Sequence, residues 1–193
     1  MEHKKTVFWT IIAIGLVGLL LFLSSHTLIN NNDKENAPAA SQQTTQITSV
    51  SACELFSIDD ARQVLGESAE KPEDLAGADA SSDDMEVTQC LYEVPPAEAG
   101  SADEQKQASL LARSAKTDSG ARSNEEVFSG AAKPANVEDV SGYGDAAFWN
   151  PEFGQLNILK GSNWYILQVG GSVPSERTLD EAKQLADVLI SSL

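Results

Sequence analysis

Cysteine and histidine are the residues of this chain that could carry covalent or metal chemistry, and both are scarce. The 193 residues include two cysteines, Cys53 and Cys90, and two histidines, His3 and His26. Nucleophilic catalysis of the Ser-His-Asp or Cys-His type needs an imidazole base beside the nucleophile. Both histidines precede the folded domain that we predict over residues 51–193. The sequence therefore predicts no catalytic triad and no histidine-based zinc site in that domain.

The spacing of the two cysteines favours a structural disulfide. A Cys-x-x-Cys motif would indicate redox chemistry, whereas Cys53 and Cys90 lie far apart in the sequence. An even number of cysteines in one small domain of an oxidising compartment is typical of a disulfide. Closing a loop of this length would stabilise the fold by about 4 kcal/mol in the chain-entropy model. We predict a bridge between Cys53 and Cys90.

Carboxylates are abundant, with 29 Asp+Glu against 13 Lys+Arg and a formal net charge of −16. This excess repels phosphate backbones, so the composition excludes a nucleic-acid partner. Carboxylate pairs can hydrolyse glycosides, but their abundance here singles out no pair. The segment 142–145 also lacks the later glycine and the Lys-Ser/Thr of a phosphate-binding loop. We expect no enzyme activity and no cofactor.

A group of acidic residues between the predicted first helix and first strand is a weak candidate for a cation site. Its members are Asp79, Asp83, Asp84 and Glu86. Calcium takes carboxylate ligands, but these residues lack the alternating spacing and the central glycine of a dedicated calcium loop. The spacing favours the alternative interpretation, a solvated acidic loop that binds no metal.

Aromatic residues concentrate in the C-terminal third of the chain. They are Tyr143, Phe148, Trp149, Phe153, Trp164 and Tyr165. Because side chains alternate along a strand, Trp164 and Tyr165 must face opposite ways. If the Tyr165 face packs on helices, Trp149, Phe153 and Trp164 could line an apolar patch for a partner or ligand, with Tyr143 as a further candidate. The alternative is that these rings complete the core or cover the second face of the sheet.

The segment before the domain predicts a membrane anchor. Residues 7–23 are apolar except for Thr10 and would span roughly 25 Å as a helix; residues 6–25 reach about 30 Å, the thickness of the bilayer core. Lys4 and Lys5 precede this run, so the positive-inside rule places residues 1–6 in the cytoplasm. A cleaved signal peptide is the alternative, but its apolar region would be shorter and followed by a small-x-small site. We predict a retained transmembrane segment over residues 7–25.

The rest of the chain predicts a tethered domain. Residues 26–50 are rich in Ser, Asn, Gln and Thr, which indicates a flexible polar linker. Residues 51–193 have the length of one domain, which this topology places in the periplasm or outside the cell. Hydrophobic periodicity predicts strands over 86–94, 107–114, 146–150, 155–160 and 164–169, and helices over 58–65, over 124–132 and from about 175. This pattern predicts an α+β fold, a mostly antiparallel sheet with helices packed on one face.

Several short segments carry a family resemblance. They are CEL at 53–55, IDDA at 58–61, LG at 65–66, CLY at 90–92 and GYGDAAFW at 142–149. These segments resemble small extracytoplasmic lipoprotein domains of actinobacteria and related sensor-type ectodomains, which are largely uncharacterised. The resemblance implies a compact α+β sandwich with the Cys53–Cys90 bridge, and it supplies no catalytic residues. The chain departs from these domains by having a predicted membrane segment in place of a lipidated cysteine.

These observations together predict a non-catalytic module of the cell envelope. We expect it to bind an envelope protein, as an interaction or sensor domain held at the membrane. The alternative is a domain that binds a small molecule or an ion.

Overall fold

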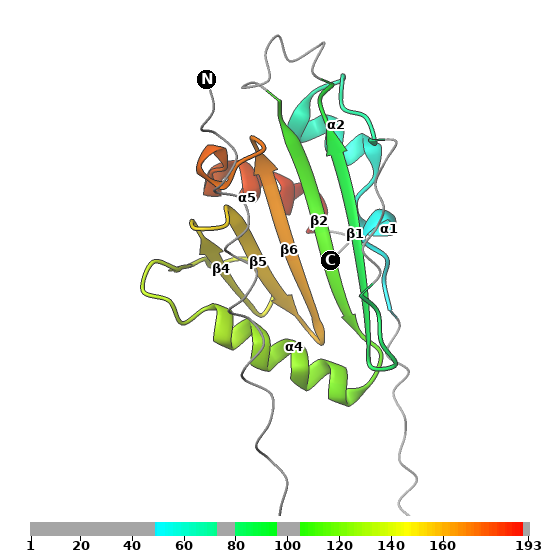
Figure 1. Ribbon diagram of the computed structural model, residues 1–193, viewed down its shortest axis with the longest axis vertical. Helices are drawn as coiled ribbons and strands as arrows, with labels where there is room; N and C mark the ends of the chain where they lie inside the picture. Colours follow the sequence, from blue (N-terminus) through cyan, green and yellow to red (C-terminus); the bar gives the residue numbers. More distant parts are fainter. Residues whose placement is uncertain (1–48, 73–79, 96–104, 191–193) are drawn as a thin grey trace, which may run out of the picture. The chain divides into compact units, whose positions relative to one another are not determined.

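A six-stranded antiparallel sheet organises the part of the chain that the computed structural model describes, namely residues 49–72, 80–95 and 105–190 (Figure 1). The strands are β1 (Met85–Glu93), β2 (Gln107–Ala115), β3 (Glu138–Asp139), β4 (Ala146–Asn150), β5 (Gln155–Lys160) and β6 (Asn163–Gly170), in the order β1-β2-β6-β5-β4-β3. The strands predicted over 146–150 and 155–160 are confirmed; the prediction for β2 differs by one residue at one end, and those for β1 and β6 differ by one residue at both ends. The short edge strand β3 was not predicted.

The predicted anchor over residues 7–25 and all but the last two residues of the predicted linker lie outside the described residues. Within residues 49–72, 80–95 and 105–190, no helix has both the length and the apolar composition needed to cross a bilayer.

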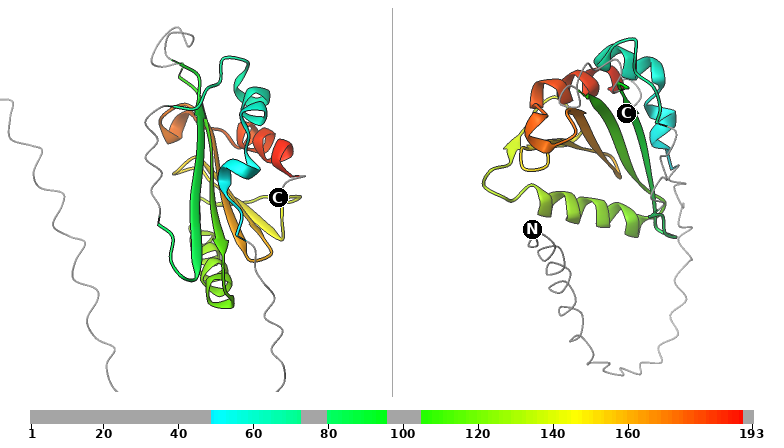
Figure 2. Two further views of the ribbon diagram at one scale, coloured as in Figure 1. Left: turned by 90° about the vertical axis from the view of Figure 1, so that its right-hand side faces the viewer. Right: turned by 45° about the horizontal axis from the view of Figure 1, so that its top comes forward.

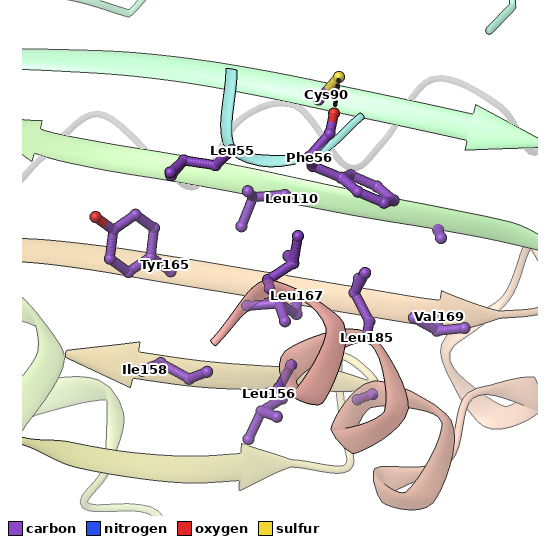
Figure 3. Close-up of a cluster of buried hydrophobic side chains, with 14 of the residues drawn as sticks. Leu55, Phe56, Cys90, Leu110, Leu156, Ile158, Tyr165, Leu167, Val169 and Leu185 are labelled. Atoms are coloured by element: carbon purple, nitrogen blue, oxygen red, sulfur yellow. Dashed lines mark hydrogen bonds between the residues drawn. The ribbon is translucent and has the colours of Figure 1, made fainter. Parts of the chain in front are cut away.

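Three helices and the main core lie on the first face of the sheet (Figure 2, left). They are α1 (Ala52–Leu55), α2 (Ile58–Leu65) and α5 (Leu179–Leu189), with the 3-10 turn η2 (Pro174–Glu176) before α5. Ser57 caps α2, because its hydroxyl accepts from the Asp60 amide while the Asp60 carboxylate accepts from the Ser57 amide. Leu185 of α5 packs over Leu167 and Leu156, and Phe56 lies beside Leu110 (Figure 3).

A fourth helix, α4 (Asp118–Ala131), packs on the opposite face of the sheet, across the lower end of the strands in Figure 1. Phe128 of α4 contacts Phe148 and Trp164, which point away from the first face. The expectation that all helices pack on one face is therefore wrong. The α4 helix also begins six residues before the predicted position 124, because Thr117 caps it by accepting from the Gly120 amide.

The predicted disulfide is confirmed. Cys53 of α1 is bonded to Cys90 of β1, with 5.0 Å between their Cα atoms. Beside it, the buried Tyr92 hydroxyl donates to the carbonyl oxygen of Phe56 at 3.2 Å, and the two rings meet edge to face. The bridge therefore fixes the short α1 segment against the edge strand β1.

Removing the bridge should cost a large part of the domain's stability. We expect the double variant Cys53→Ser/Cys90→Ser to lower the free energy of unfolding by about 4 kcal/mol, because the unfolded chain regains the entropy of the open loop. Urea denaturation of the variant and of the oxidised parent measures the difference. The parent treated with reductant is the matched control and should unfold like the variant; an unchanged midpoint for both would contradict a stabilising role.

Candidate functional site

The predicted aromatic surface is not formed by its tryptophans. Trp149 is 5% exposed and belongs to the first-face core, whereas Trp164 is 7% exposed and packs under α4 on the second face. The two rings therefore lie on opposite sides of the sheet, and the expectation of a shared patch with Phe153 is wrong. The alternative, that the rings complete the core and cover the second face, describes their positions.

The remaining two candidates have different surroundings. Tyr143 is half-buried against the edge of the main core, and its hydroxyl donates to Asp187 Oδ1 at 2.9 Å. Phe153 is 50% exposed in the turn between β4 and β5. Of the four predicted surface residues, Phe153 alone presents half of its side chain to solvent.

The weak cation candidates are not brought together as a metal site. Asp79 lies outside the described residues. Asp83 is exposed and belongs to no group of possible metal ligands among the described residues. Asp84 Oδ1 instead accepts a hydrogen bond from the Thr117 hydroxyl at 2.5 Å. Across the described ranges, no three His, Cys, Asp or Glu side chains are grouped so that they could hold a metal ion.

Part of the second face is left uncovered by α4 and forms a shallow hollow of about 240 Å³. Its lining, which we name the open face, consists of Gln89, Ser109, Leu111, Gln155, Ile166 and Gln168. Strand register places Ser109 opposite Gln168 and Leu111 opposite Ile166, and the Ser109 hydroxyl donates to Gln168 Oε1 at 3.2 Å. The open face therefore combines amide and hydroxyl groups with two aliphatic side chains and carries no charge.

Two exposed apolar side chains lie on the loops that precede β5 and follow β6, two strands that help to line the open face. Phe153 is 50% exposed before β5, and Val173 is 45% exposed between β6 and α5. Arg177 ties these loops together because its guanidinium donates to three backbone carbonyls, those of Phe153 at 3.3 Å, Gly171 at 3.1 Å and Ser172 at 3.0 Å. We name Phe153, Val173 and Arg177 the Phe153 rim.

The Phe153 rim requires glycine at position 154, directly before β5. Gly154 has φ 58°, and a Cβ there would lie 2.8 Å from Arg177 Cβ, so a larger residue would displace the guanidinium. Gln155 follows directly and lines the open face. Burial lowers the pKa of Arg177, against an opposing effect of Glu176, and the guanidinium remains charged at neutral pH. Gln155 of the open face lies two positions after Phe153 of the rim.

A second hollow, of about 350 Å³, lies between the start of α4 and β1. We name it the Arg113 pocket; its lining is Ala80, Ser82, Asp84, Met85, Val87, Arg113, Ser119, Gly120 and Ser123. A Cβ on Gly120 would collide with the carbonyl oxygen of Asp84, so glycine is needed for α4 to approach β1 this closely.

Arg113 is held in place by uncharged neighbours. Its Nε donates to Asn124 Oδ1 at 3.2 Å, and its Cζ lies 5.3 Å from the centre of the Trp164 ring. Asn124 is fully buried, and its Nδ2 donates to the carbonyl oxygens of Arg113 and Ser162, both at 2.8 Å. Burial lowers the pKa of the Arg113 guanidinium, which still carries its charge at neutral pH.

Sequence reasoning missed Arg113, Asn124 and Arg177. One signal for Arg113 was available, because alternation places it on the same face as Leu111 and Ser109, and it is the one charged residue of β2. Asn124 donates to the carbonyl of Ser162 and Arg177 to that of Phe153, both distant in the sequence, and no local sequence pattern predicts such hydrogen bonds.

Comparisons with known proteins add no relative: no protein-family model, no curated protein and no solved structure gives a significant match to the chain. The resemblance to actinobacterial lipoprotein domains stays a prediction.

The buried and the exposed aromatic residue should respond differently to truncation. We expect Trp164→Ala to lower the free energy of unfolding by about 3–5 kcal/mol, because it empties the space under Phe128 and Phe148. It also removes the hydrogen bond from Trp164 Nε1 to the buried Asn157 Oδ1. Phe153→Ala, the matched control, should stay within about 0.5 kcal/mol of the parent. Equal losses in urea denaturation would refute this assignment of core and surface.

The stability of the fold should fall at alkaline pH through Tyr143. Burial, and then the hydrogen bond to Asp187, raise the pKa of Tyr143 from 10.0 to about 12. The folded state therefore holds this proton more tightly than the unfolded state. The resulting stabilisation is complete below pH 10 and is lost as the pH rises towards about 12.

Urea midpoints measured across that window test this effect. We expect Tyr143→Phe to flatten the decline without removing it, because burial also raises the pKa of Tyr92 and Tyr165. A variant whose midpoint falls as steeply as that of the parent would show that Tyr143 contributes nothing.

Proposed function

We propose that this domain is a non-catalytic protein-interaction module of the cell envelope, which binds its partner through the open face and the Phe153 rim. The observation that carries the proposal is the pair of exposed apolar side chains, Phe153 and Val173, on loops that one guanidinium ties together. Aromatic anchors on rigid supports dominate the energetics of protein interfaces, since little entropy is lost when they bind.

The chemistry of the open face indicates what the partner presents. The chain has a net charge of −16, yet the six residues of the open face are uncharged. Charged groups are depleted at the cores of protein interfaces because their desolvation is costly. The expected partner is an envelope protein that places an apolar side chain against the Phe153 rim and neutral hydrogen-bonding groups against Gln155 and Gln168.

The proposed location rests on the sequence and is compatible with the disulfide. Residues 7–25 would anchor the chain with residues 1–6 in the cytoplasm and the domain in the periplasm or outside the cell. Disulfides persist in these compartments and are rare in the cytosol, so the Cys53–Cys90 bridge supports this side of the membrane. The absence of enzyme activity rests on the residue inventory, in which both histidines precede the domain.

Site-specific photo-crosslinking in native membranes tests the proposed surface. A photoreactive phenylalanine analogue replaces Phe153 at the rim or Gln168 on the open face of the full chain. We expect both positions to give an adduct with the same protein, because the proposed interface includes both. The identified partner, once purified, should bind the Phe153→Ala chain roughly 30-fold more weakly, the loss of about 2 kcal/mol typical of an interface anchor.

Val127 supplies the matched control position. It is 44% exposed and apolar like the rim residues, but it lies on α4 and does not line the open face. The analogue at this position should give no adduct with that partner. Adducts of equal yield at Val127, or none at Phe153 and Gln168, would reject the surface.

A further inference from the structure

Arg113 is a preorganised cation without an anionic partner. Its Nε bonds to the amide of Asn124 and its plane lies near Trp164, but no carboxylate of the described residues comes within 4.0 Å of the guanidinium. This is unexpected in a chain with 29 acidic residues. The two outer nitrogens of the guanidinium have the fork geometry that binds a carboxylate through two parallel hydrogen bonds.

A negative charge lines the same pocket at a distance from Arg113. Asp84 is held by the Thr117 hydroxyl, while the neighbouring Lys116 ammonium donates to the carbonyl oxygen of Ser82 at 3.0 Å. Neither Arg113 nor Lys116 forms an ion pair with Asp84, judged over the ranges that the structure describes. The Arg113 pocket therefore holds one cation and one anion, both positioned by neutral groups and separated from each other.

We propose that the Arg113 pocket binds a free α-amino acid with a small side chain, its carboxylate on Arg113 and its ammonium on Asp84. The volume of about 350 Å³ accommodates a ligand of this size. Ala80, Met85 and Val87 supply apolar contacts for the side chain, and the Ser82, Ser119 and Ser123 hydroxyls are available for the remaining hydrogen bonds. Binding here does not depend on the partner surface of the Phe153 rim.

A zwitterion fits the pocket better than a simple anion. Asp84 is exposed but lines the same hollow as Arg113, so a carboxylate bound to Arg113 without an ammonium group would bring two negative charges into one pocket, where they repel each other. An amine without a carboxylate would meet the guanidinium in the same unfavourable way. The pair Arg113 and Asp84 therefore selects for a ligand with both charges.

Titration calorimetry on the full chain in detergent micelles tests the proposal. The probes are glycine, alanine and valine, with propionate and ethylamine as analogues of alanine that lack one charge each. We expect alanine to bind at least tenfold more tightly than propionate or ethylamine, as the loss of a charged hydrogen bond predicts. Alanine should also raise the thermal unfolding midpoint of the chain. No heat and no shift with any of the three amino acids would overturn the proposal.

Two substitutions separate the roles of the charges. Asp84→Asn keeps an acceptor for Thr117 and should weaken alanine binding roughly tenfold while strengthening propionate binding. Asp83→Asn, the matched control, removes an exposed neighbouring carboxylate outside the pocket and should change neither affinity. Arg113→Lys keeps the charge but not the fork and should weaken both ligands. If propionate matches alanine and Asp84→Asn changes neither, the zwitterion site is rejected.

A final control separates this site from the partner surface. Phe153→Ala should bind alanine like the parent, because Phe153 does not line the pocket. Loss of alanine binding in this variant would contradict the independence of the two sites.

Discussion

The pairing of β2 with β6 is the constraint on which the rest of the fold depends. It joins residues more than fifty positions apart, Gln107–Arg113 to Trp164–Gly170, and so connects the β1–β2 hairpin to the β3–β6 meander. The register puts Leu110 against Leu167 on the core face and Arg113 against Trp164 on the other. A slip of one residue would exchange the two faces, burying the arginine and exposing the leucines, so the burial of the core itself enforces the register.

Asn124 extends this constraint from the sheet to α4. One buried amide accepts from Arg113 Nε and donates to carbonyls of β2 and of the β5–β6 turn, so it satisfies backbone groups that the helix would otherwise desolvate. An apolar residue at position 124 would pack between α4 and the sheet but would leave those carbonyls without their side-chain donor. A carboxylate would neutralise Arg113. The amide both satisfies the carbonyls between α4 and the sheet and leaves the guanidinium charge available to the Arg113 pocket.

The sequence predicted the first face better than the second for a physical reason. The helices α2 and α5 bury continuous apolar stripes and begin at clear caps, and the alternation in β6 correctly separates Trp164 from Tyr165. In α4 the residues that face the sheet are Gly120, Asn124 and Phe128, of which one is large and apolar. The helix therefore has no hydrophobic stripe to detect, and the aromatic rings that it covers resemble an exposed patch in the sequence. The Arg177 contacts were equally hidden, because they depend on where two loops meet.

The Arg113 pocket and the Phe153 rim lie at opposite ends of β6, and the open face lies between them. Arg113 lies opposite Trp164 near the start of β6, whereas Arg177 donates a hydrogen bond to the carbonyl of Gly171 just after its end. The extended chain from Trp164 to Gly171 is about 23 Å long. Coupling over such a distance needs an element with two stable arrangements that both ligands bias. The connecting element here is a central strand, paired on both sides and packed in the main core through Leu167 and Val169, and it has no alternative register that keeps these two side chains buried. The structure therefore favours independence of the Arg113 pocket and the Phe153 rim: a ligand in the pocket would stabilise the domain without changing the contacts that the rim makes with its partner.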